Sequence, residues 1–145
     1  MQISEQLEQD ITQLVQNTKN ALIGSVDADG FSNIKAMLPP RKREGVQIIY
    51  FSTNTSSERV KQFQINPKAC VYFYDSVTFQ GVMLKGRMAV SQSPEYKEML
   101  WRQGDTLYYP LGVTDPDYCV LIFRTESISY YSDMETKVFT VTSAY

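Results

Sequence analysis

Apolar residues near the start of the chain recur at every third or fourth position, separated by Gln, Glu and Asp: Ile3, Leu7, Ile11, Leu14 and Val15. This spacing places the apolar side chains on one narrow face of a helix. The pattern predicts an amphipathic helix over residues 4–17, within an N-terminal segment of residues 1–20.

The pattern then changes to β-branched and aromatic runs bounded by turn residues, which is typical of strands. Six strands are expected over residues 21–26, 31–37, 46–51, 68–74, 79–90 and 119–131, and alternation over residues 137–141 adds a seventh. The third is expected to stop at Ser52. Gly30 supplies the positive φ of a tight hairpin between the first two strands. Gly81 and Gly86 indicate a bulge in the fifth strand.

Two short helices are expected between the strands. The first starts at Ser56 or Ser57 and ends near residue 64, because Pro67 disfavours helix in the residue before it. The second starts at Ser93 and Pro94, a cap followed by proline at the first helical position, and runs to about residue 104. The pattern as a whole predicts an α+β, mainly β fold, an antiparallel barrel of six to seven strands with an N-terminal helix and two short helices.

The composition narrows the function. The 145 residues fit a single domain, residues 1–145. The sequence contains no histidine, which excludes Ser-His-Asp and Cys-His nucleophile pairs and histidine ligands to metal or haem. Fourteen Lys and Arg against sixteen Asp and Glu give a net charge of −2, so no broad positive field is available to attract nucleic acid or an anionic membrane.

Cys70 and Cys119 lie far apart inside apolar segments, so we expect two buried free thiols and no metal site. The start of the chain is rich in Gln and Glu, without an apolar leader, and no apolar stretch approaches the roughly 20 residues that cross a bilayer. We therefore expect a cytoplasmic protein. The basic run of residues 41–43 is interpreted as a solvated loop.

The segment from Ser52 to Arg59 carries the most informative chemistry, a polar turn between a buried strand and a helix start. Its hydroxyl groups, free backbone N–H groups at a helix N-terminus and the guanidinium of Arg59 would suit a phosphate. The same residues are also compatible with an ordinary Ser/Thr-rich loop that ends in a helix cap. The segment alone leaves both interpretations open.

In its wider context this segment resembles the flavin-binding split barrels of the pyridoxamine 5′-phosphate oxidase superfamily. The resemblance includes residues 33–37 (Asn-Ile-Lys-Ala-Met) on the preceding strand and the spacing to Asn66 and Pro67. The second half resembles the small general stress protein branch through residues 101–104 (Trp-Arg-Gln-Gly) and 109–118 (Tyr-Pro-Leu-Gly-Val-Thr-Asp-Pro-Asp-Tyr). The resemblance covers residues 21–131.

The resemblance implies a split β-barrel that binds FMN at a homodimer interface. Lys35, Thr53, Ser57 and Arg59 would hold the phosphate. The candidate cofactor-binding residues are Lys35, Ala36, Met37, Leu38, Ser52, Thr53, Asn54, Ser57, Arg59 and Trp101. Two departures from the family pattern predict weakened flavin binding, because Lys35 replaces an arginine and Glu58 occupies a position of the basic pair.

Trp101, Tyr108 and Tyr109 have two interpretations: they cap the barrel core, or their loop approaches the flavin of the partner subunit. No side chain stands out as an acid or base, so no catalytic residue is named. The expected function is an FMN-dependent oxidoreductase with an unknown small-molecule substrate. A non-enzymatic flavin-binding or stress-related module and a deazaflavin-binding relative stay open as alternatives.

Overall fold

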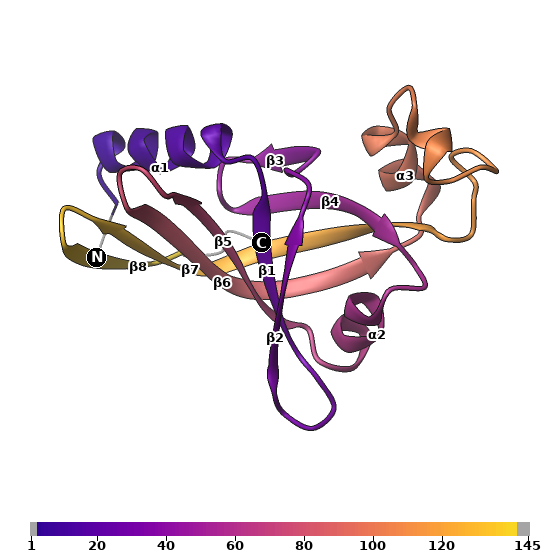
Figure 1. Cartoon of the computed structure of the whole chain (residues 1–145), viewed down its shortest axis with the longest axis horizontal. Helices are drawn as coiled ribbons and strands as arrows, with labels where there is room; N and C mark the ends of the chain where they lie inside the picture. The colour runs from indigo at the N-terminus through magenta and orange to yellow at the C-terminus, as the bar shows by residue number, and fades with distance from the viewer. Residues whose placement is uncertain (1–2, 142–145) are drawn as a thin grey trace.

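The computed structural model describes residues 3–141 as a twisted antiparallel sheet with helices at its periphery (Figure 1). The strands are β1 (Ala21–Val26), β2 (Ser32–Met37), β3 (Lys42–Glu44), β4 (Ile48–Asn54), β5 (Lys68–Asp75), β6 (Gln80–Ser91), β7 (Tyr118–Ser132) and β8 (Glu135–Thr140). The helices are α1 (Glu5–Asn17), α2 (Glu58–Ile65), α3 (Pro94–Leu100) and the 3₁₀ turn η1 (Asp105–Leu107).

The strand order is β2-β1-β5-β6-β7-β4-β3, with β8 paired to β7. No ladder joins β2 to β3 within residues 3–141, so the barrel stays split rather than closed. β7 is the longest strand, and it pairs with β6 over most of its length, with β4 through its first half and with β8 through its second. The split barrel predicted from the sequence is confirmed.

Two apolar clusters lie on opposite faces of the β4–β7 pair. Ile49 and Phe51 belong to the main core, where α1 also buries its apolar face, while Ile48 and Tyr50 belong to a second cluster together with Leu100 of α3. Because both faces of these strands are buried, their sequence is a continuous apolar run without polar alternation.

Most of the elements agree with the sequence predictions. Ser4 caps α1, and its hydroxyl oxygen accepts a hydrogen bond from Leu7 N. Gly30 has φ 85° in the β1–β2 turn. The bulge is confirmed at Gly86, where the β6–β7 register shifts and a Cβ would lie 1.9 Å from the carbonyl oxygen of Arg124. Gly81 is different: it pairs regularly, and its missing side chain leaves room for the hydroxyl end of Tyr72.

Several predictions need correction, including the burial of Cys70, which is half-buried while Cys119 is buried. The basic run is not wholly a loop, because residues 42–44 form the edge strand β3 opposite Ile48–Tyr50; exposed charges are common on edge strands. β4 continues past Ser52 to Asn54, because residues 118–120 of β7 pair with it there. α3 ends at Leu100 rather than near Gly104, because Trp101 adopts extended geometry and packs against aromatic rings. The sheet therefore has eight strands rather than six or seven.

Among residues 3–141 no helix is long and apolar enough to cross a membrane.

Candidate functional site

Two hollows adjoin where β2, the end of β4 and the start of α2 meet. The β4 hollow, of about 220 Å³, is lined by Ala36, Met37, Leu38, Pro39, Arg41, Phe51, Ser52, Thr53, Asn54, Arg59, Tyr108 and Tyr109. The α2 hollow, of about 290 Å³, is lined by Ser25, Asn33, Ile34, Lys35, Ser57, Glu58, Arg59 and Gln62. Arg59 lines both, so this residue lies where the two hollows adjoin, and its Nη2 is on the side of Thr53.

Arg59 carries a positive charge that no carboxylate of the described residues neutralises. Its Nη2 lies 3.5 Å from Thr53 Oγ1, and its Nε is buried without a hydrogen-bond partner. The hydroxyl oxygen of Ser52 is also buried without a hydrogen bond among the described residues, but it lies beside Tyr118, on the other face of β4 from Thr53. Partial burial lowers the pKa of the guanidinium, since desolvation penalises its charged form. A buried donor without a partner is costly, and an anion at this point would satisfy the Nε of Arg59.

The structure brings nine of the ten candidate residues together around these hollows. Lys35 and Ser57 line the α2 hollow, Arg59 lines both, and the six candidates among residues 36–38 and 52–54 line the β4 hollow. Trp101 lies outside both, with its ring 5.4 Å from that of Tyr118 and 6.3 Å from that of Tyr109, measured between centroids.

The backbone of the polar turn is less free than the sequence suggested. Thr55 N donates to the carbonyl oxygen of Asp117, and Ser56 N donates to its carboxylate. The hydroxyl oxygen of Ser57 accepts a hydrogen bond from Val60 N at 3.4 Å and so caps α2. An anion at this site would therefore rely on side chains and the first turn of α2 rather than on the N–H groups of Thr55 and Ser56.

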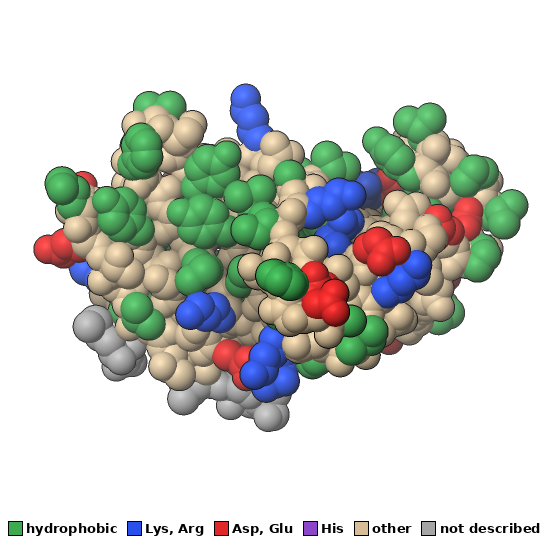
Figure 2. All heavy atoms as spheres, turned by 60° about the horizontal axis from the view of Figure 1, so that its bottom comes forward, with side chains coloured by type: hydrophobic (Ala, Val, Ile, Leu, Met, Phe, Trp, Pro, Cys, Tyr) green, Lys and Arg blue, Asp and Glu red, His purple; other side chains and the backbone are tan. Residues whose placement is uncertain are grey.

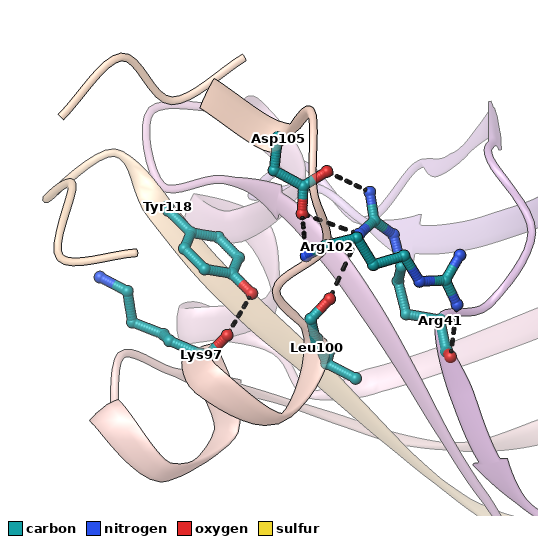
Figure 3. A network of polar contacts seen from close by, with 6 residues as sticks. All are labelled: Arg41, Lys97, Leu100, Arg102, Asp105 and Tyr118. Atoms are coloured by element: carbon teal, nitrogen blue, oxygen red, sulfur yellow. Dashed lines mark hydrogen bonds and ion pairs between the residues drawn. The ribbon is translucent and has the colours of Figure 1, made fainter. Parts of the chain in front are cut away.

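The loop that follows α3 is fixed by an ion pair that the sequence analysis missed (Figure 3). Arg41 donates from both terminal nitrogens to the two carboxylate oxygens of Asp105, each at 2.8 Å, and one nitrogen also reaches Leu100 O. Arg102 N donates to the same carboxylate. These contacts hold the pKa of Asp105 below its usual range, with Arg41 as the largest cause. The sequence contains no local signal that pairs two positions 64 residues apart.

The three aromatic residues of this loop divide between the two interpretations. Tyr109 is buried and stacks on Tyr118 at 4.8 Å, and Trp101 packs beside both, so these two cap the second apolar cluster. Burial raises the pKa of Tyr109 to about 12, which keeps its hydroxyl protonated at neutral pH. Tyr108 is 58% exposed and lines the β4 hollow of its own chain.

Exposed apolar side chains surround the hollows. Leu38 at the end of β2 and Leu107 in the loop after α3 are 64% and 80% exposed, and Ile34 and Leu111 are also exposed. Figure 2 shows hydrophobic side chains gathered in patches on both sides of a group of Lys and Arg side chains. This arrangement leaves a charged site bordered by apolar surface.

Comparison with known proteins identifies the family. Residues 7–132 match the family described as pyridoxamine 5′-phosphate oxidase. The chain belongs to the pyridoxamine 5′-phosphate oxidase family. The search of curated proteins found no match to the chain.

Solved structures support the assignment of the chain to this family. A Clostridium acetobutylicum protein related to general stress protein 26, of the pyridoxinephosphate oxidase family, is 37% identical, with TM-score 0.87 over 96% of this chain and 97% of that chain. General stress protein 26 from Bacillus anthracis is 19% identical, with TM-score 0.73 over 92% and 98%. A heme binding protein from Mycobacterium smegmatis is 12% identical, with TM-score 0.74 over 97% of this chain and 59% of that one.

The charges and walls of the two hollows suit the binding of an anionic ligand. Residues 3–141 contain no group of three or more Cys, Asp or Glu side chains placed to hold a metal ion. The described charges of the hollows are those of Lys35, Glu58, Arg59 and the paired Arg41. Such a site can hold an anion at Arg59 and an apolar group beside it.

We predict that Asp105→Asn lowers the free energy of unfolding by about 3 kcal/mol at neutral pH, because the Arg41 guanidinium loses its counter-charge. Because the folded-state pKa of Asp105 is lowered, its contribution is present above the unfolded pKa, about 3.9, and is lost as pH falls through the folded value. Urea unfolding of both proteins from pH 7 to pH 3 should show the difference shrinking on acidification. An undiminished difference at low pH would contradict the role of the carboxylate charge.

Proposed function

We propose that the chain is a flavoprotein that binds FMN in the two hollows, with the phosphate at Arg59, and that it acts as an FMN-dependent oxidoreductase. The observation that carries the proposal is the half-buried guanidinium of Arg59, which has a buried Nε without a partner and forms no ion pair among the described residues. Family membership supports a flavin as the ligand.

The phosphate end of FMN suits the junction of the hollows. A phosphate monoester carries close to two negative charges at neutral pH, by analogy with phosphorylated side chains. Lys35 and Arg59 supply two positive charges, and neither forms an ion pair among the described residues. Thr53 and Ser57 add hydroxyl groups, and the start of α2 adds the positive end of a helix dipole.

The ring end of FMN suits the β4 hollow. Met37, Leu38 and Phe51 give it apolar walls, and Tyr108 adds an aromatic ring. Its other cation, Arg41, is already neutralised by Asp105. When bound, FMN supplies hydride and single-electron transfer, while the chain binds and orients it and restricts its contact with water.

The similarity to a heme binding protein does not favour haem as the ligand here. The sequence contains no histidine, so an imidazole axial ligand is unavailable.

The partner proposed for the site is a second copy of the chain. Every residue of β2 is exposed or only half-buried, and Ile34 is 74% exposed. Met37 packs against the main core, but Ile34 and Ala36 on the other face of β2 are exposed, and an exposed apolar strand face fits an interface better than a solvated edge. Both hollows are also open to solvent, and a partner seated against β2 would cover the ring of a bound flavin.

For the dimer we predict the mass of two chains in sedimentation equilibrium. Ile34→Asp should shift the protein toward the mass of one chain, because the new carboxylate would be buried in the interface. Val77→Asp is the matched control, since Val77 is 89% exposed in the β5–β6 turn, at the other end of the sheet from α3 (Figure 1). A single-chain mass for the unchanged protein would contradict the dimer.

For the flavin we predict that the fluorescence of FMN is quenched when it binds, and that FMN raises the midpoint of thermal unfolding of the protein. Arg59→Ala should weaken FMN binding by about tenfold or more, because a charged hydrogen-bonding partner of the phosphate is lost. Arg87→Ala, on an exposed face of β6, should leave the affinity unchanged. Absence of both quenching and stabilisation in the unchanged protein would refute the flavin proposal.

Reduction of bound FMN by NADH or NADPH, followed by turnover with an electron acceptor, separates an enzyme from a binding module.

Glu58 lines the α2 hollow together with the two unpaired cations, and among the described residues its only ion pair is an exposed one with Lys61. We predict that Glu58→Gln tightens FMN binding about two- to fivefold, because a negative charge near the phosphate is removed. Titrations at low and high salt should show the gain diminishing as salt screens the repulsion. Riboflavin, which has no phosphate, should bind both proteins equally, and Glu98→Gln on α3 is the control. An equal gain for riboflavin would contradict the electrostatic explanation.

A further inference from the structure

The polar turn between β4 and α2 is held by one residue that lies far from it in the sequence. Asp117 accepts three hydrogen bonds from three consecutive residues of the turn. Asn54 Nδ2 donates to Oδ2 at 3.0 Å, Thr55 N donates to the carbonyl oxygen at 2.7 Å, and Ser56 N donates to Oδ1 at 2.9 Å. Both carboxylate oxygens and the backbone carbonyl of Asp117 are therefore engaged with this turn.

Asp117 is itself fixed on its other side. Its backbone N donates to Asp115 Oδ1 at 2.9 Å, and the side chain of Asp115 is buried. Gln92 Nε2 joins the two segments, since it donates both to Pro116 O at 2.9 Å and to Thr55 Oγ1 at 3.2 Å. The carboxylate thus has a defined position relative to β7, and the turn takes its position from the carboxylate.

The turn separates the two hydroxyl groups proposed for the phosphate. Thr53 lies immediately before the clamped residues, at the end of β4 and 3.5 Å from Arg59 Nη2, and Ser57 lies immediately after them as the cap of α2. Displacement of residues 54–56 would change the distance between Thr53 and the first turn of α2.

We infer that Asp117 is a positioning residue that sets the geometry of the phosphate-binding turn and so gives the site its preference for a phosphorylated flavin over riboflavin. This inference rests on the proposed function. Asp117 lines neither hollow and acts through Asn54, Thr55 and Ser56. Its hydrogen bonds, with Asn54 as the largest cause, lower the pKa of its carboxyl group, so it is ionised at neutral pH and accepts from both donors.

The test separates geometry from charge with two variants of the same residue. Asp117→Asn removes the charge but keeps the length: its oxygen can accept from Ser56 N, and its amide can donate to the side chain of Asn54 after that amide turns over. Asp117→Glu keeps the charge but moves the carboxylate outward by one methylene. We expect the Asn variant to bind FMN within about threefold of the unchanged protein and the Glu variant to bind it about tenfold more weakly.

The dissociation constants of FMN and riboflavin are measured by fluorescence quenching for each protein, together with thermal unfolding midpoints. Riboflavin binding should stay within about twofold in both variants, because it makes no phosphate contact. Equal losses for the two flavins, or a greater loss in the Asn variant than in the Glu variant, would overturn the inference. If the Glu variant does not fold, Asp117→Ala replaces it with the same expected loss for FMN alone. If the unchanged protein binds neither flavin, the proposed function itself fails.

Discussion

β4 and β7 pair from Ile48 opposite Arg124 to Asn54 opposite Tyr118, and apolar clusters cover both faces of the pair. Burial on both faces fixes the register, because a slip by one residue would exchange the side chains of the two cores. The register also sets the site. It places the end of β4 next to the start of β7, so the turn that enters α2 meets Asp117 just before β7 begins.

Of the two arginines that line the β4 hollow, only one forms an ion pair among the described residues. Arg41 is neutralised by a bidentate pair with Asp105, whereas Arg59 has no carboxylate among the described residues and keeps a buried Nε without a partner. A protein that needed both arginines only for stability would gain by pairing both, since a half-buried cation loses hydration without compensation. The contrast favours a binding role for Arg59.

Local patterns in the sequence predicted most of the fold but not the contacts that complete the site. The N-terminal helix, the β1–β2 hairpin and the bulge at Gly86 follow from periodicity and glycine conformation, which act over a few residues. The edge strand β3 was missed because its charged residues show no apolar alternation. The early end of α3 was missed because it coincides with the packing of Trp101 against Tyr109 and Tyr118, which no local pattern announces. The Ser52 to Arg59 segment was recognisable from its residue types, whereas its clamp by Asp117, 61 residues from Ser56, has no local signal.

The distribution of charge around the two hollows also constrains the ligand. Since Asp105 neutralises Arg41, the unpaired positive charge of the site is concentrated at Arg59 and Lys35, while the opposite part of the β4 hollow is bounded by Met37, Leu38 and Tyr108. A ligand that matches both parts has an anionic group at one end and a flat apolar body at the other. A fully hydrophilic phosphate ester would leave the apolar walls unsatisfied, and an uncharged aromatic would leave Arg59 unpaired. The flavin phosphate that we propose meets both requirements, and it would supply redox chemistry that the side chains lining the hollows do not carry themselves.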